Sequence, residues 1–289
     1  MNDNPEDAEA HNVTGTTTPS GLVEPRDTCA PQPVATIALT VAYDGALFAG
    51  FANQPGQDTV QGRLESALGT FLGRPVQTVG AGRTDSGVHA LGQVVSFSAS
   101  SQDLERRDLL RSVNALARPG LVVREVRHAP RGFSARFDAV SREYRYRIVC
   151  GTVPPMFLGP VSWWIKKELD LDAMREAAAL LVGERDFCSF CVTASALDKR
   201  TVRRVDTIDI SRETQLGEEC VVIRVVGNAF LHSMVRTIIG TLSLVGTGKK
   251  NVEWVGEALA ACDRAAAGPT APAEGLTFWS VEYPEAVWR

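Results

Sequence analysis

Hydrophobic positions in the first part of the chain change their spacing several times, and each spacing predicts an element. Residues 34–43 (VATIALTVAY) form a β-branched run that is typical of a strand. Apolar residues then recur every three or four positions from 60 to 72, which predicts an amphipathic helix. The following runs predict strands at 76–79 and 93–97, a helix at 104–116 and a strand at 121–126. The resulting order, β-α-β-β-α-β, is that of a ferredoxin-like unit.

The second part of the chain has a similar pattern. Residues 144–148 (YRYRI) alternate strictly, which predicts a strand with both tyrosines on one face and both arginines on the other. We then expect a helix at 171–181, strands at 202–210 and 220–226, helices at 230–245 and 252–261, and a strand at 276–283. The sequence therefore predicts an α+β protein of two similar halves, although no sequence repeat relates them.

The first 34 residues differ in composition from the rest. They are rich in Pro, Thr, Asp and Glu, with few large apolar groups, so they cannot bury enough surface to offset the entropy of ordering. We predict a disordered tail at 1–34, an N-terminal half at 35–135 and a C-terminal half at 136–289. The tail has six acidic residues against Arg26 alone, so the remaining 255 residues carry a net charge of +1 although the whole chain carries −4.

Composition excludes several classes of protein. The 289 residues are 44% hydrophobic and 22% charged, as in globular proteins. No apolar run is long enough for a membrane span, and the N-terminus is acidic where a secretory signal is basic and then apolar. We expect a cytoplasmic protein that does not bind membranes. The six irregularly spaced cysteines predict reduced thiols.

Basic residues are concentrated at 124–147, a segment that contains seven arginines and three acidic residues. A second basic cluster occupies 199–204 (KRTVRR). Guanidinium groups suit phosphate recognition, so these clusters favour a nucleic-acid partner bound mainly by charge. A solvated surface is the alternative interpretation of such runs.

The segment at 80–92 (GAGRTDSGVHALG) joins two predicted strands and is longer than the two to five residues that hairpins use. Its four glycines allow a ligand to approach the backbone closely. A carboxylate at Asp85, two residues from Arg83, can be kept ionised and aimed. A turn in which Asp85 pairs with Arg83 is the alternative. The spacing matches no phosphate-binding loop, and no lysine lies nearby.

Residues 82–90 (GRTDSGVHA) resemble the active-site loop of the TruA-type tRNA pseudouridine synthases. The resemblance extends in order from residue 35 to about 283. Further matching motifs lie at 43–45 (YDG), 48–54 (FAGFANQ), 59–68 (TVQGRLESAL), 133–136 (FSAR), 142–146 (REYRY), 186–190 (DFCSF), 227–242 (GNAFLHSMVRTIIGTL) and 271–276 (APAEGL). The chain departs from the family pattern at Ser86, where alanine is frequent, at Ser233, where a bulkier residue is frequent, and in its acidic tail.

The resemblance implies a pseudouridine synthase fold, in which antiparallel sheets of two ferredoxin- or RRM-like halves meet at a central active-site cleft. It implies isomerisation of uridine to pseudouridine at positions 38, 39 and 40 of the tRNA anticodon stem-loop. It also implies a homodimer whose two subunits shape the tRNA-binding cleft. Neither a cofactor nor a metal is expected.

We expect specific roles for five residues, of which Asp85, Arg236 and Tyr144 take theirs from the resemblance and Arg83 and His89 from their positions in the loop. Asp85 is the expected nucleophile and Arg236 the cation that pairs with it; a solvated helix face is the alternative place for Arg236. Tyr144 is expected to stack on the everted base, although tyrosines on alternating strands often serve the core. Arg83, beside Asp85, is expected to contact a phosphate or hold the base out; a structural role is the alternative. His89 is expected either to contact RNA or to pack within the loop.

Two other interpretations compete with an isomerase. A non-catalytic RNA-binding module could use aromatic strands and arginines to stack bases, but it has no use for the anion of Asp85 beside a polyanion. The pair Cys188 and Cys191 has the spacing of a redox motif or of half a zinc site. No second such pair and no spaced histidines accompany it, and the neighbouring Phe187 and Phe190 favour core packing.

Overall fold

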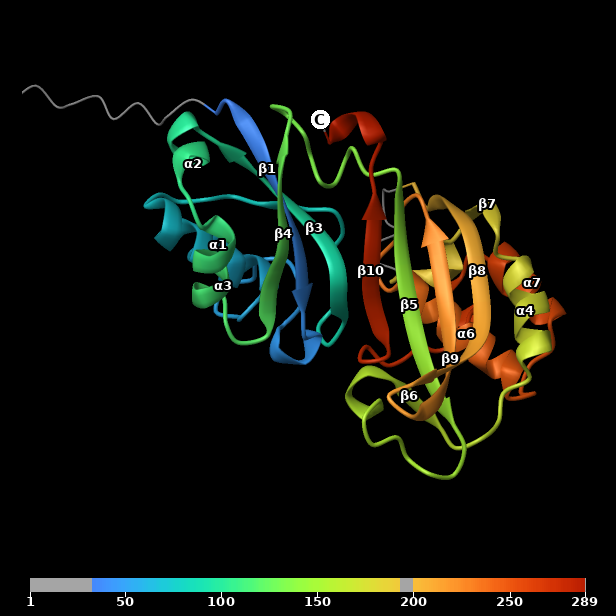
Figure 1. The fold of residues 1–289 in the computed structure, drawn as a ribbon. Coiled ribbons are helices and arrows are strands. Elements are labelled where there is room, and N and C mark those ends of the chain that lie inside the picture. The colour runs from blue at the N-terminus through green and yellow to red at the C-terminus, as the bar shows by residue number, and fades with distance from the viewer. Residues whose placement is uncertain (1–32, 193–199, 289) are drawn as a thin grey trace, which may run out of the picture. The chain divides into compact units, whose positions relative to one another are not determined.

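The fold is described from a computed structural model that covers residues 33–192 and 200–288 (Figure 1). The predicted tail at 1–34 lies outside the described residues apart from its last two positions. Most of the second basic cluster, from Arg200 to Arg204, lies inside them. Within the described residues, no helix has the length and apolarity needed to cross a bilayer.

The first group of elements has the predicted order, except that one predicted helix is divided into two. It comprises β1 (Ala35–Tyr43), α1 (Val60–Leu72), β2 (Val79–Gly80), β3 (His89–Ala99), α2 (Ser101–Glu105), α3 (Leu109–Leu116) and β4 (Leu121–Ala129). The single helix predicted at 104–116 is wrong, because two helices stand there. Asp108 has a φ of 64°, and a residue in this left-handed conformation cannot continue a right-handed helix.

The second group also matches the predicted order and adds two short strands. It comprises β5 (Ser141–Cys150), β6 (Trp163–Ile165), α4 (Leu171–Ala179), β7 (Gly183–Asp186), β8 (Val202–Gln215), β9 (Glu218–Gly227), α6 (Met234–Gly246), α7 (Glu253–Ala260) and β10 (Leu276–Glu282). Strands of three and four residues are too short to show a period, so β6 and β7 left no signal. The helix predicted from 230 begins at Met234 instead, after Ser233 with a φ of 59°.

The strands of the described residues form one ten-stranded sheet, in the order β4-β1-β3-β10-β5-β9-β8-β7, with β2 paired to β3 and β6 paired to β5. This corrects the expectation of separate antiparallel sheets, because β10 pairs with β3 in parallel and joins the two groups. The close approach depends on a glycine: a Cβ on Gly92 would lie 2.3 Å from the backbone oxygen of Trp279. Since β3 carries the end of the 80–92 segment, this junction brings that segment beside the second group.

Helices cover the strands of each group (Figure 1). α1, α2 and α3 lie beside β1, β3 and β4, whereas α4, α6 and α7 lie beside β5, β9 and β8. Leu39 of β1 and Leu64 of α1 are fully buried, as are Ile223 of β9 and Ile238 of α6. All four belong to one hydrophobic core cluster, which spans both groups. The core therefore fixes the position of α6 relative to the junction between β3 and β10.

Candidate active site

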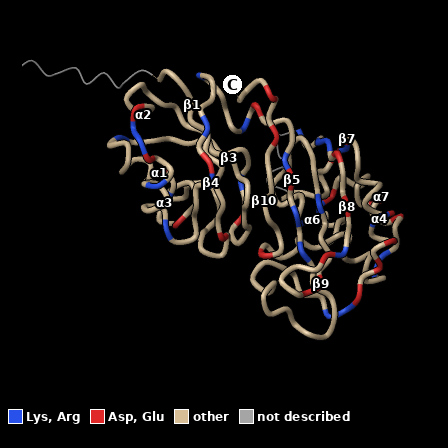
Figure 2. Tube along the Cα trace, in the orientation of Figure 1, with Lys and Arg blue, Asp and Glu red and all other residues tan. Residues whose placement is uncertain are grey.

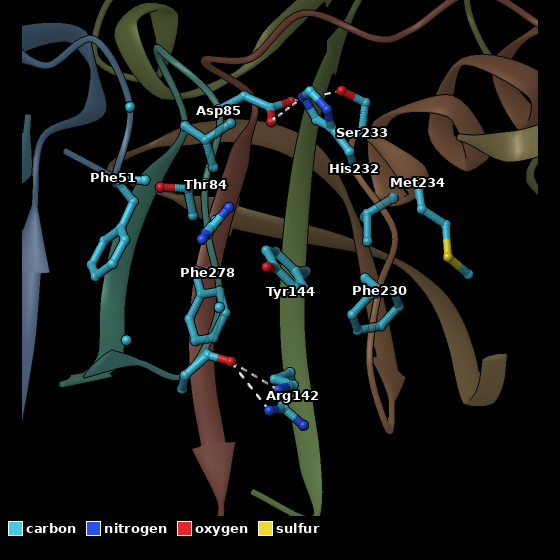
Figure 3. A pocket seen from close by; sticks show the side chains of 18 of the residues that line it. Phe51, Thr84, Asp85, Arg142, Tyr144, Phe230, His232, Ser233, Met234 and Phe278 are labelled. Carbon is cyan, nitrogen blue, oxygen red and sulfur yellow. Dashed lines mark hydrogen bonds and ion pairs between the residues drawn. The ribbon is translucent and has the colours of Figure 1, made fainter. Parts of the chain in front are cut away.

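A cavity of about 930 Å³ lies where the two groups of elements meet. Its wall is formed by the loop between β2 and β3, the first residues of β5 and β10, and the segment that leads into α6 (Figure 3). The lining includes Arg83, Asp85, Arg142, Tyr144, Phe230, His232, Ser233, Arg236 and Phe278. Cationic, anionic and aromatic side chains from distant parts of the sequence therefore share one concave surface.

The loop that carries Asp85 is anchored on β1 and on the turn that follows it. The hydroxyl groups of Tyr43 and Thr84 lie 2.8 Å apart and are both buried. The backbone N–H of Val88 donates to the carbonyl of Asp85 over 3.2 Å, which closes a tight turn around Asp85. Gly45 makes room for this turn, because a Cβ there would lie 2.2 Å from the carbonyl oxygen of Val88. The sequence thus folds Asp85 onto a rigid support.

The carboxylate of Asp85 is held by three side chains that precede or begin α6. Arg236 Nη1 lies 2.7 Å from Oδ2, and Ser233 Oγ donates to the same oxygen over 2.8 Å. His232 Nε2 lies 3.2 Å from Oδ1. Figure 3 shows His232 and Ser233 turned toward Asp85 at one end of the cavity. The Asp85 side chain is only 21% exposed, so the Arg236 cation offsets much of the cost of removing this anion from water.

Arg236 is fixed in turn by the segment that follows α7. Its Nε donates to the carbonyl of Ala271 over 2.8 Å, while the N–H of Ala271 donates to the carbonyl of Arg236 over 3.0 Å. Gly240, one turn further along α6, permits this contact because a Cβ there would lie 1.8 Å from the carbonyl oxygen of Pro269. Arg236 is 18% exposed, so it does not lie on a solvated helix face.

Aromatic rings form the middle of the cavity wall. Tyr144 is 7% exposed and meets Phe230 and Phe278 edge to face, with ring centroids 5.2 and 4.7 Å away. Figure 3 shows these three rings at the same level, below Asp85. Burial raises the pKa of Tyr144 well above its usual value, so its phenol stays protonated. The ring cluster offers an apolar surface next to an anion.

The two remaining predicted site residues lie in different surroundings. Arg83 is exposed, lines the cavity and makes no hydrogen bond or ion pair with a described residue. The alternative in which Arg83 pairs with Asp85 is therefore wrong. His89 is 7% exposed and does not line the cavity; its Nδ1 accepts a hydrogen bond from the N–H of Gly45 over 3.2 Å. Burial lowers the pKa of His89, so the ring is neutral and acts as part of the loop's support.

Arg142 is a residue of the site that the sequence interpretation missed. Its guanidinium donates five hydrogen bonds, to the carbonyls of Ala81, Arg136, Ala139 and Asn228. These carbonyls belong to three segments that meet at the cavity, so Arg142 joins the segments. Figure 3 shows the Arg142 side chain among the residues that line the cavity. The signal was available in the strand alternation, because position 142 shares a face with Tyr144.

The basic run at 124–147 does not form one exposed stripe. Arg142 and Arg147 are buried, at 8% and 9% exposure. Arg145 pairs with Glu143 over 2.7 Å and lies 3.8 Å from the ring centre of Trp279. Figure 2 shows basic positions interleaved with acidic ones along the strands. The expectation that the whole run contacts nucleic acid is therefore wrong, because these arginines are engaged within the protein.

The cysteine pair has the features of core packing. Cys191 is fully buried, and its thiol donates to the carbonyl of Cys188 over 3.5 Å. Burial raises the pKa of Cys191, the opposite of what a reactive thiol requires. Phe187 and Phe190 are fully buried beside the pair. Within the described residues, no group of three or more His, Cys, Asp or Glu side chains could hold a metal ion.

Comparisons with known proteins identify relatives over most of the chain. A family model described as tRNA pseudouridine synthase matches residues 39–138 and 177–284. The tRNA pseudouridine synthase A of Brevibacillus brevis is 44% identical over 248 residues, which cover 86% of this chain and 99% of that protein. Its counterpart from Paraburkholderia phytofirmans is 42% identical over 251 residues, which cover 86% and 90%. A chain in a crystal structure of a Cbf5-Nop10-Gar1 complex is 14% identical, with a match that covers 72% of this chain and 54% of that chain at a TM-score of 0.31.

Proposed function

The chain belongs to the tRNA pseudouridine synthase family, and on this basis we propose that it converts uridine to pseudouridine at positions 38, 39 and 40 of the tRNA anticodon stem-loop. The observation that carries the proposal is the carboxylate of Asp85, which lies in the cavity wall 2.7 Å from Arg236 and beside a cluster of aromatic rings. An anion so placed has no use in mere RNA binding, because it repels phosphates.

The reaction requires one bond to break and one to form. The N1–C1′ bond of uridine breaks, the uracil turns over, and C5 bonds to C1′. The proton on C5 is released and N1 gains a proton, so substrate and product are isomers and no electrons are transferred. In this proposal Asp85 is the nucleophile; it attacks the ring or the sugar, or it assists loss of the base. No cofactor takes part.

The surroundings of Asp85 support roles for its neighbours. Arg236 donates to Oδ2 and orients the carboxylate, since Arg236 is itself held by Ala271. Tyr144 stacks on the everted uracil as a neutral phenol, and Phe230 and Phe278 complete the apolar wall. The exposed guanidinium of Arg83 contacts a tRNA phosphate or holds the base out. His89 supports the loop from below and does not contact the substrate.

The organisation of the chain is part of the same proposal. The strand orders β4-β1-β3-β2 and β10-β5-β9-β8 match each other and the order of a ferredoxin-like sheet, which supports two related halves at 35–135 and 136–289. The active-site cleft would then lie between the halves. As the family resemblance implies, we propose that the enzyme acts on tRNA in the cytoplasm as a homodimer.

The test is direct. Purified protein is incubated with unmodified tRNA that carries tritium at C5 of uridine, with EDTA and no nucleotide, and release of tritium into water is measured. Pseudouridine is then mapped by carbodiimide modification and primer extension. We expect release and modification at the three anticodon-arm positions. We expect Asp85→Asn to abolish release while tRNA binding survives, and Asp172→Asn, at a side chain 94% exposed on α4, to have no effect. Turnover by Asp85→Asn would refute the assignment.

A further inference from the structure

The two oxygens of the Asp85 carboxylate have unequal surroundings. Oδ2 accepts two hydrogen bonds, from Ser233 Oγ over 2.8 Å and from Arg236 Nη1 over 2.7 Å. Oδ1 is contacted by His232 Nε2 at 3.2 Å. The Arg236 side chain is 18% exposed and bound to Ala271, whereas the His232 side chain is 55% exposed. Oδ2 therefore accepts two hydrogen bonds, one of them from a guanidinium that is itself held in place, whereas Oδ1 lies against the partly exposed His232 ring.

Ser233 contributes to this asymmetry at a cost to its own backbone. It precedes the first residue of α6, a position where a serine hydroxyl commonly caps the helix. The Ser233 side chain makes no capping hydrogen bond. Its hydroxyl donates to Asp85 instead, and its φ of 59° lies in the left-handed region that disfavours residues other than glycine. Neither the helix nor the backbone conformation explains a serine here, but its bond to the carboxylate does.

We propose that Ser233 is a positioning residue that, together with Arg236, holds Oδ2 of Asp85 and leaves Oδ1 as the oxygen that reacts with uridine. This inference rests on the proposed function. Two donors on one oxygen prevent rotation about the Cβ–Cγ bond, so the carboxylate presents the same oxygen in every turnover. Attack through Oδ2 would require both donors to be displaced, one of which is tied to Ala271. Attack through Oδ1 leaves both of these donors in place.

The test separates the hydroxyl from the backbone. Ser233→Gly removes the donor and suits the positive φ, so we expect the melting temperature to be kept or raised. We expect the single-turnover rate of tritium release from C5-labelled tRNA to fall roughly ten- to hundredfold, the range for losing a hydrogen bond to a charged group. The Kd for tRNA should be unchanged, because the chemistry and not the binding is affected. Ser233→Asn, which tolerates a positive φ and carries a donor, should recover part of the rate.

A matched control and a second variant make the outcomes decisive. Leu216 has a φ of 52°, is 73% exposed and does not line the cavity. Leu216→Gly therefore relieves a similar backbone strain outside the site, and this variant should react at the wild-type rate. His232→Ala should cost less rate than Ser233→Gly. A wild-type rate in Ser233→Gly overturns the inference, as does a larger loss in His232→Ala. If the wild type itself releases no tritium, the proposed function fails and this inference fails with it.

Discussion

Removing the guanidinium of Arg236 tests how the protein keeps a carboxylate reactive inside a cavity. In the wild type, this side chain donates to Oδ2 of Asp85 over 2.7 Å and to the carbonyl of Ala271 over 2.8 Å. Arg236→Ala removes both bonds and the positive charge, while leaving Asp85 in its half-buried place. The carboxylate then loses its fixed orientation and the cation that offset its desolvation.

The expected magnitude follows from the geometry of this pair. A net hydrogen bond to a charged group contributes about 1.5–3 kcal/mol, and breaking a fully buried ion pair costs about 3–5 kcal/mol. Both side chains are about one-fifth exposed, at 21% and 18%, so water screens part of the interaction. We therefore expect a loss of about 2–3 kcal/mol, which corresponds to a rate roughly 30- to 150-fold lower. Arg236→Lys keeps the charge but not the fork that reaches both partners, so its loss should be smaller.

The assay is single-turnover tritium release from C5-labelled tRNA, with enzyme in excess and the Kd for tRNA measured in parallel. Arg74→Ala is the matched control. Arg74 pairs with the buried Asp103 over 2.6 Å and neither residue lines the cavity, so the loss of Arg74 should lower the melting temperature but not the rate. An Arg236→Ala variant that reacts at the wild-type rate would refute the electrostatic reasoning.

Three further changes test the supports of the site. Burial raises the pKa of Tyr43 from 10.0 to about 12. Between these pH values the unfolded chain binds fewer protons than the folded protein, so the free energy of unfolding falls as pH rises. In urea titrations, Tyr43→Phe should reduce the steepness of this fall by about 1.4 kcal/mol per pH unit, and an unchanged pH dependence would contradict the reasoning. Arg142→Lys leaves some of the four carbonyls that Arg142 serves without a donor and should cost about 2–4 kcal/mol of unfolding free energy in urea; a loss below 1 kcal/mol would show that these bonds matter little. Gly240→Ala places a methyl group 1.8 Å from the Pro269 carbonyl oxygen, so both the melting temperature and the tritium-release rate should fall, and retention of both would refute the packing argument.

Periodic segments were predictable because burial of one face imposes a period on the sequence. The strand at 35–43 and the helices at 60–72, 171–179 and 253–260 begin and end within two residues of their predicted limits. The strand β6 and the break before Leu109 were not predictable. A three-residue strand has no period, and a single left-handed residue such as Asp108 leaves no mark in the hydrophobic pattern.

Some residues of the site were also predictable from the sequence, and others were not. The length, glycines and charged residues of the segment at 80–92 indicated a functional loop, so Asp85 and Arg83 could be identified from the sequence. That Arg236 lies beside Asp85 came from a family resemblance, since 151 residues separate the two. The sequence left open whether His89 packs within the loop or contacts RNA, and it did not indicate that Ser233 donates to Asp85, because each outcome depends on how a side chain turns after the chain has folded.

The sequence by itself determined the type and order of most elements, because local periodicity records which side of each element is buried. Only the tertiary structure decided that β10 joins the two groups of strands, that Arg142 serves carbonyls and not phosphates, and that the Asp85 oxygens are bound unequally. These outcomes depend on contacts between residues far apart in the chain. The free energy of such contacts is set by three-dimensional distance and burial, which no local pattern of residues encodes.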